Sequence, residues 1–161
     1  MPPHTDDARQ FEDQFWQGVA SRNAIRVSVR ALVMLDDHIL VQRLNHPDSV
    51  RWFPGGELEF GEPMEAGLLR EIAEESTLAV TAITYRFVFN NRFERDGASF
   101  HFLEHYFEVT PAGWELDTLE DHFDHEWIPI ADADSFDIRP SSVRDILRVP
   151  GWRTIRVLEV S

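Results

Sequence analysis

The chain has 161 residues, a length that suits one domain with a packed core, and 43% of these residues are hydrophobic. It has no cysteine, which excludes disulfides and thiolate metal sites. The formal net charge is −14 and there is no Lys/Arg run, so we expect neither a nucleic-acid nor a membrane-surface partner. The acidity indicates either simple solubility or carboxylates that hold a divalent cation for a polyanionic substrate.

Signals for membrane insertion or export are missing from the sequence pattern. No apolar run approaches the roughly 20 residues that span a bilayer. The opening MPPHTDDARQ has neither the basic nor the apolar region of a signal peptide. We therefore expect a soluble, cytoplasmic protein.

The N-terminal part divides into a polar start and an amphipathic stretch. Residues 1–8 are rich in Pro and Asp, and we expect them to be disordered. Phe11, Phe15 and Val19 then recur every four residues, which predicts a helix over residues 8–19. This helix either packs on the domain or forms a lid or a dimer contact. A homodimer through the helix is a hypothesis.

Residues 23–161 read as one domain behind an N-terminal extension of residues 1–22. Residues 25–35 and 38–44 are β-branched runs around a two-residue Asp turn, which predicts a hairpin. The other expected elements are strands over 79–89, 100–110 and 126–130, a hairpin loop over 90–99, a helix over 140–148 and a closing strand over 152–160. Strands on both sides of one clear central helix predict an α/β fold, a sandwich with a mixed β-sheet between helices.

Chemistry-bearing residues concentrate in the segment 52–80, WFPGGELEFGEPMEAGLLREIAEESTLAV. Gly55 and Gly56 follow a proline, so the strand stops and the backbone can turn where side chains would obstruct it. A helix over about residues 63–76 then opens after Glu62, because proline suits the first helical position and a glutamate favours the positive end of the helix dipole.

Three carboxylates of this helix fall on one side of a helical wheel. Glu71, Glu74 and Glu75 lie within an arc of about 100°. The opposite side, which we expect to face the core, holds Ala66, Leu69, Ile72 and Ala73. Salt bridges cannot easily relieve the repulsion, since Arg70 is the helix's one cation. The carboxylates therefore form either a solvated acidic face or a site for Mg²⁺ or Mn²⁺.

The segment resembles the box of the Nudix hydrolases. That pattern is Gly, five residues, Glu, seven residues, then Arg-Glu-aliphatic-any-Glu-Glu-any-Gly-aliphatic, and here the matching residues in register are Gly56, Glu62, Arg70, Glu71, Ile72, Glu74, Glu75 and Leu78. One position departs, because Thr77 stands where the family has a glycine that would close the helix in the left-handed conformation. The resemblance implies a Nudix-like α/β/α sandwich.

The resemblance also implies roles for the box residues. Glu74 and Glu75 would coordinate Mg²⁺ or Mn²⁺, joined by Glu71 and by the carbonyl of Gly55 or Gly56. The catalytic set would be Arg70, Glu71 and Glu74, with Arg70 orienting Glu71 through a charge-assisted hydrogen bond. The general base would be Glu71 or a carboxylate from a later loop. Glu62 would support the loop before the helix or bind a second metal.

Members of this family hydrolyse a pyrophosphate bond in a nucleoside diphosphate linked to another group, so the resemblance implies a small-molecule nucleotide substrate. Metals would neutralise the phosphates while a positioned water attacks phosphorus in line. Residues expected to bind substrate or to supply a further carboxylate are Arg30, Arg43, Phe53, Glu120, Asp121 and Asp124. Aromatic side chains that either stack on a base or belong to the core are Trp52, Phe53, Phe89, Phe93 and Trp127. The group beyond the diphosphate stays open.

Two other functions remain as alternatives. Isopentenyl-diphosphate isomerisation uses the same fold, but the thiol expected in that active site has no counterpart in a chain without cysteine. A non-catalytic Nudix-like domain that senses a nucleotide usually loses box carboxylates, whereas Glu71, Glu74 and Glu75 are all present. Retention of the carboxylates favours the enzyme.

Overall fold

The computed structural model describes residues 5–159 of the chain. The elements are α1 (Thr5–Arg22), β1 (Arg26–Leu35), β2 (His38–Leu44), β3 (Arg51–Trp52), β4 (Gly55–Glu57), α2 (Met64–Glu75), β5 (Val80–Arg95), β6 (Ala98–Pro111), β7 (Phe123–Pro129), the 3-10 helix η1 (Ile130–Ser135), β8 (Ile138–Arg139), α3 (Ser141–Ile146), the 3-10 helix η2 (Trp152–Thr154) and β9 (Val157–Glu159). No helix within these residues is long and apolar enough to cross a membrane.

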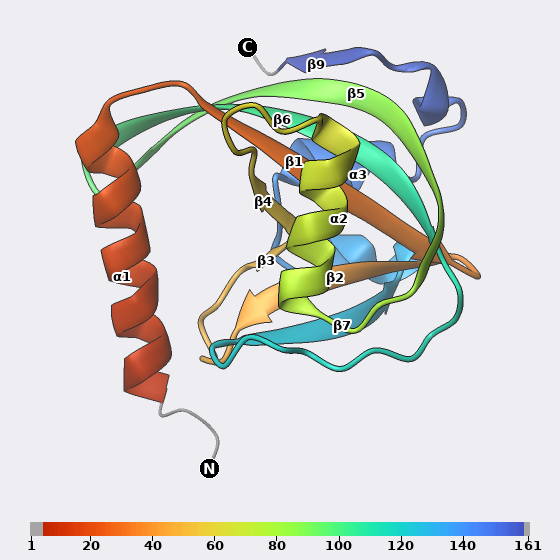
Figure 1. Cartoon of the computed structure of the whole chain (residues 1–161), viewed down its shortest axis with the longest axis horizontal. Coiled ribbons are helices and arrows are strands. Elements are labelled where there is room, and N and C mark those ends of the chain that lie inside the picture. The colour runs from red at the N-terminus through yellow and green to blue at the C-terminus, as the bar shows by residue number, and fades with distance from the viewer. Residues whose placement is uncertain (1–4, 160–161) are drawn as a thin grey trace.

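The described strands join in one mixed sheet with the order β8-β3-β2-β1-β6-β5-β9, while β4 pairs with β1 and β7 pairs with β2. Strand β1 runs parallel to β6, and β5 and β6 form a long antiparallel hairpin. Strand β1 contacts β2 only next to their shared turn, at Met34↔Ile39 and Leu35↔His38. The other half of β1 pairs with β4, at Ser28↔Glu57 and Arg30↔Gly55. Strand β1 therefore pairs with β2 near one end and with β4 near the other, and β4 lies beside α2 (Figure 1).

Hydrophobic cores lie on both faces of this sheet. On one face Leu68 and Ile72 of α2 pack with Val33 of β1 and Phe107 of β6. On the other face the helical segments at the C-terminal end pack against neighbouring residues of the same strands, and this core includes Leu32, Tyr106, Val143, Leu147 and Trp152. Figure 1 shows α2 in front of β1 and α3 behind the sheet. The predicted fold class, a mixed sheet between helices, is confirmed.

Several expected boundaries differ from the observed ones. Residues 90–99 were expected to form a loop, but β5 and β6 continue to a tight turn at Asp96-Gly97, where both residues have positive φ. The expected disorder of residues 1–8 is wrong for residues 5–8, which are helical, and Ala8 is fully buried; residues 1–4 lie outside the described part. Of the closing strand expected over 152–160, residues 152–154 form η2 and residues 157–159 form β9, which pairs with β5; residue 160 lies outside the described part.

Helix α1 packs on its own domain along its length. The ring of Trp16 lies edge-on to Phe93 and Phe100, with centroid distances of 5.8 and 5.1 Å, and stacks on Phe102 at 6.3 Å. Ion pairs hold the two ends and the middle of the helix, and they join Arg9 to Asp48, Glu12 to Arg95, and Arg22 to Glu57. Glu12 also shares a hydrogen bond of 2.9 Å with the ring of His46. The amphipathic helix predicted from the spacing of Phe11, Phe15 and Val19 is therefore present, and it is docked.

Candidate active site

The glycine pair lets three backbone segments meet closely. Gly55 has a φ of +134°, and a Cβ there would collide with the carbonyl of Val29 on the paired strand. A Cβ on Gly56 would collide with the carboxylate of Glu71. The two glycines therefore bring β4 against β1 on one side and against the carboxylate-bearing side of α2 on the other.

The inward stripe of α2 differs from the one expected from the helical wheel. The buried residues of the helix are Gly67, Leu68, Ile72 and Glu75, and Glu71 is partly buried. Ala66, Leu69 and Ala73, which were expected to face the core, are exposed, and Leu69 is 43% exposed. Leu68, Glu71, Ile72 and Glu75 follow the i, i+3, i+4, i+7 spacing, so two carboxylates share a stripe with the core residues. Glu74 alone of the three is solvent-exposed.

Burial raises the pKa values of the two carboxylates that face inward, Glu71 and Glu75. Burial raises the pKa of Glu75 to about 8, while the positive charge of Arg30 acts in the opposite direction. The Oε2 atom of Glu75 accepts a hydrogen bond of 3.3 Å from the backbone N–H of Gly55. Burial also raises the pKa of Glu71, against hydrogen bonding and attraction from Arg70. Charged carboxylates at these positions are costly without a cation, and perturbed groups of this kind cluster at functional sites.

Arg70 binds several acceptors at once. Its guanidinium donates to Glu62 at 2.7 Å, to Glu71 at 2.9 Å, to Glu74 at 3.2 Å and to the carbonyl of Glu57 at 3.2 Å. The one cation of the helix thus reaches Glu71 and Glu74 of the three carboxylates on α2, together with Glu62 before the helix, and it leaves the repulsion at Glu75 unrelieved by an arginine of α2. The hydrogen bond from Arg70, together with one from the N–H of Glu59, lowers the pKa of Glu62.

Helix α2 ends before Thr77, and no residue in the left-handed conformation closes it. Ser76 has an extended backbone with a φ of −155°, and its N–H bonds to the carbonyl of Ile72. The non-glycine residues between 5 and 159 with positive φ are Asn23, Asp36, Asp37 and Asp96, so Thr77 is not among them. Thr77 instead pairs with Asp117, through an N–H to carbonyl bond of 3.0 Å and an N–H to hydroxyl bond of 2.7 Å. A contact with the loop after β6 thus replaces the usual glycine closure.

Glu104 of β6 is a site residue that the sequence interpretation missed. It is 4% exposed, and its Oε2 accepts from Asn91 at 3.2 Å and from Tyr106 at 3.4 Å. Burial raises its pKa, and the nearby Arg30, 3.8 Å away, acts against the increase. Arg30 in turn donates to the carbonyls of Phe53 and Gly55, at 3.2 and 3.1 Å. The sequence signal that could have identified Glu104 is its position on a strand face that otherwise holds Phe100, Phe102 and Tyr106.

A cavity of about 880 Å³ collects most of these groups. Of the residues expected in the site, its lining includes Gly55, Gly56, Glu71, Glu74, Glu75, Arg30, Phe53 and Glu120. Of the aromatic candidates, Trp52, Phe89 and Phe93 also line it. Arg70, Glu62 and Arg43 are not part of this lining. Arg43 pairs instead with Glu126 at 2.7 Å and with Asp124 at 3.6 Å. Asp121 and Trp127 lie outside the described lining as well.

The donor set suits a hard divalent cation. Glu71, Glu74 and Glu75 offer carboxylate oxygens beside the carbonyls of a glycine turn, and the buried Glu75 has a raised pKa that a bound cation would offset. Between residues 5 and 159, no group of three acidic or histidine side chains is already gathered around a common point. Arg70 holds two of the three carboxylates, and the N–H of Gly55 contacts the third.

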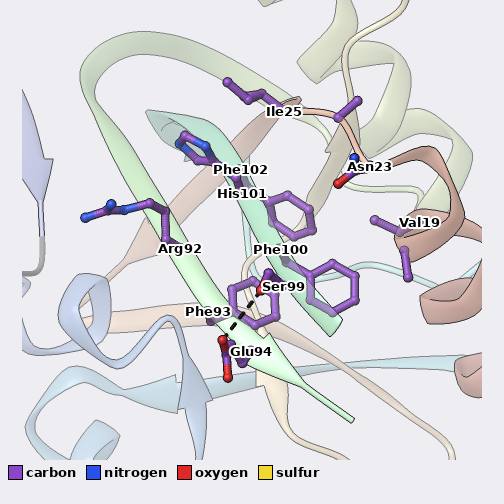
Figure 2. A pocket seen from close by; sticks show the side chains of 12 residues that line it. Val19, Asn23, Ile25, Arg92, Phe93, Glu94, Ser99, Phe100, His101 and Phe102 are labelled. Atoms are coloured by element: carbon purple, nitrogen blue, oxygen red, sulfur yellow. Dashed lines mark hydrogen bonds between the residues drawn. The ribbon is translucent and has the colours of Figure 1, made fainter. Parts of the chain in front are cut away.

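A second cavity, of about 510 Å³, lies at the C-terminal end of α1 and shares Arg92, Phe93, Glu94 and Phe102 with the larger one. Figure 2 shows Val19 and Asn23 on one side of it and the hairpin residues Arg92, Phe93, Phe100 and His101 on the other. The three carboxylates of α2 do not line this cavity.

Comparisons with known proteins identify the same fold in other proteins. A crystal structure of a MutT NUDIX hydrolase from Burkholderia pseudomallei matches with 25% identity and a TM-score of 0.58, over 68% of this chain and 86% of that one. A MutT protein from Bacillus halodurans has the same fold at 20% identity and a TM-score of 0.60, over 84% of this chain and 87% of that one.

A third structure with this fold is a bifunctional NMN adenylyltransferase/ADP ribose pyrophosphatase from Francisella tularensis, complexed with AMP and a Mn ion. It is 21% identical, with a TM-score of 0.58 over 88% of this chain and 45% of that one. A search of curated proteins finds no match. A family model described as NUDIX domain matches residues 24–148, which is most of the chain. The chain therefore belongs to the Nudix family of pyrophosphohydrolases.

Proposed function

We propose that this protein hydrolyses a pyrophosphate bond in a nucleoside diphosphate derivative or a nucleoside triphosphate, with Mg²⁺ or Mn²⁺ as cofactor. One observation carries the proposal: Glu75 is buried, with a pKa raised to about 8, in the wall of a cavity that Glu71 and Glu74 also line. The neighbour complexed with AMP and a Mn ion supports both the substrate class and the cofactor.

The residues of the box have separable roles in this proposal. Glu71, Glu74, Glu75 and the carbonyl of Gly55 or Gly56 would hold the cation, which neutralises phosphate charge and activates water when bound. Glu71, or Glu120 from the loop before β7, takes the proton of the attacking water. Arg70 keeps Glu71 oriented through its 2.9 Å hydrogen bond. It also binds the side chain of Glu62, which accepts a hydrogen bond from the N–H of Glu59 in the loop before α2.

Residues elsewhere in the cavity would bind the substrate. Arg30, Phe53 and Glu120 line it and are proposed to contact the nucleotide. Arg43 and Asp121, which lie outside the described lining, would meet only a substrate that extends beyond it. The net charge of −14 supports a small-molecule partner that arrives with its cation rather than a nucleic acid.

A cytoplasmic location goes with the proposed substrate class, because phosphorylated nucleotides are intracellular metabolites. A homodimer through α1 remains a hypothesis. Light scattering on the full chain and on a variant without residues 1–20 tests it, since a dimer built on α1 would become a monomer after the deletion.

The test of function is a panel of nucleoside diphosphate derivatives and triphosphates, incubated with Mg²⁺ or Mn²⁺ and scored for phosphate and pyrophosphate. We expect at least one compound to turn over. Glu75→Gln should abolish turnover, whereas Glu65→Gln, at an exposed position on the same helix, should not change it. If no compound reacts, or if Glu75→Gln reacts as fast as the wild type, the hydrolase assignment fails and a nucleotide-sensing domain becomes the better explanation.

A further inference from the structure

Helix α1 lies before the residues that match the NUDIX domain, which begin at residue 24, yet it lines the same cavity as the carboxylates of α2. Its contributions to the lining are Phe11, Glu12, Phe15 and Trp16. An appended helix has thus become part of the wall of the site. Three of these four residues are aromatic, so the chemical part of a substrate that contacts α1 can be inferred from them.

The helix is fixed at both ends, so its position relative to the site is defined. Phe11 stacks on His122 at 4.9 Å and meets Phe123 edge-on at 5.7 Å, which fastens the helix to the loop before β7. Trp16 contacts the aromatic rings of Phe93 and Phe100 near the tip of the β5–β6 hairpin. Figure 1 shows α1 standing apart from α2, with β4 between them.

Phe15, unlike the partly buried Trp16, keeps much of its ring accessible. It is 40% exposed while lining the cavity. The guanidinium of Arg26 lies 5.1 Å from its ring centroid, and Arg26 also pairs with Glu57 at 3.0 Å, so the ring is held in place from one side. An ordered aromatic ring at the edge of a polar cavity is a stacking surface for a flat aromatic ligand.

The polar groups of the same cavity suit the edge of such a ligand. Glu104 and Asn91 line it and are joined by a 3.2 Å hydrogen bond through Oε2 of Glu104. The other carboxylate oxygen, Oε1, lies 3.8 Å from Nε of Arg30, which is beyond hydrogen-bonding distance. This oxygen is therefore an acceptor for an N–H donor.

We propose that α1 completes a subsite for the nucleobase, in which the base stacks on Phe15 and presents an N–H donor toward Glu104 while the diphosphate faces the carboxylates of α2. The assignment rests on the proposed function, since the base belongs to the nucleotide whose pyrophosphate bond is cleaved. It adds that a segment outside the matched domain determines which nucleotides bind well.

Calorimetric titration with AMP, GMP, CMP, UMP and ribose 5-phosphate tests the subsite, because these ligands differ only in the base. The wild-type protein should bind at least one nucleoside monophosphate about tenfold or more tightly than ribose 5-phosphate. Phe15→Ala should remove most of this advantage and leave the affinity for ribose 5-phosphate unchanged. Phe15→Leu, which keeps apolar volume without an aromatic face, should behave in the same way.

Gln14→Ala serves as the control, since Gln14 is an exposed residue of the same helix outside the described lining. Unchanged nucleotide affinity in both Phe15 variants, or equal wild-type affinity for nucleotides and ribose 5-phosphate, would overturn the subsite. The titration needs no turnover, so its result is separate from the hydrolysis panel. Base-dependent binding without hydrolysis would sink the proposed function alone, and hydrolysis without base-dependent binding would sink the subsite alone.

Discussion

The backbone N–H of Asp117 donates a hydrogen bond of 2.7 Å to the hydroxyl of Thr77, at the position where the family pattern has glycine. Restoring that glycine should therefore not stabilise this chain. We expect Thr77→Gly to lower the free energy of unfolding by about 1–2 kcal/mol, because the hydrogen bond is lost and the unfolded chain gains freedom. Urea denaturation measures the change. Thr77→Ser keeps the hydroxyl and should stay close to wild type; a Thr77→Gly protein more stable than wild type would show that the contact is unimportant.

Arg70 supplies geometry as well as charge to the acidic cluster. Arg70→Lys keeps the positive charge but cannot donate to Glu62, Glu71 and Glu74 together, since an ammonium lacks the planar fork. We expect activity with Mg²⁺ to fall by about 10- to 100-fold, as for other residues that orient metal ligands. Steady-state kinetics over a range of Mg²⁺ concentrations measures the loss, and circular dichroism confirms folding. Activity equal to that of wild type would exclude an orienting role.

Gly56 is the point at which β4 approaches the carboxylate of Glu71. A methyl group there would occupy the space of that carboxylate, so Gly56→Ala should displace Glu71 and reduce kcat by about 100-fold. Gly113→Ala is the matched control, because nothing lies within 4 Å of a Cβ at that position. If the two variants have the same kcat, close approach at Gly56 has no part in catalysis.

Glu108 gives the fold a pH dependence that does not involve the active site. Burial raises the pKa of Glu108, but hydrogen bonds from Arg153 and Arg86 outweigh this effect, so the pKa in the folded protein lies below its ordinary value. A lowered carboxyl pKa contributes stability at pH values above the unfolded-state pKa, and this contribution is lost as pH falls through the folded-state pKa. Glu108→Gln should therefore cost about 1 kcal/mol near neutral pH, with a smaller difference from wild type in acid. Thermal melts from about pH 7 to pH 3 measure the difference, and a constant gap would contradict the assignment.

Local sequence rules were sufficient to predict the helix of the box and the carboxylates that it carries. The glycine pair, the proline after Glu62 and the 3.6-residue period predicted a helix over about residues 63–76, and α2 spans Met64–Glu75. The carboxylates named from spacing do line one cavity. These features depend on neighbours within a few residues, where backbone geometry follows directly from residue type.

Features that depend on pairing between segments far apart in the sequence were harder to predict from the sequence. Glu104 reaches Arg30 because β6 runs parallel to β1, and nothing local to either strand specifies that pairing. The helical wheel placed Leu69 in the core, whereas β4 and the cavity turn the carboxylate side of α2 inward and leave Leu69 43% exposed. The contribution of α1 to the cavity wall could not be predicted locally either, since Phe15 is held by Arg26 of β1 and Trp16 by the distant β5–β6 hairpin.

Strands β1 and β6 send adjacent side chains into opposite cores, as Leu32 and Val33 do on β1 and as Tyr106 and Phe107 do on β6. Neither core can come apart without breaking hydrogen bonds of this shared pair of strands. Amide hydrogens of β1 and β6 should therefore exchange with solvent last, and only when the whole domain opens. The two cores thus melt as one cooperative unit, and a ligand bound in the cavity beside α2 would slow amide exchange in both.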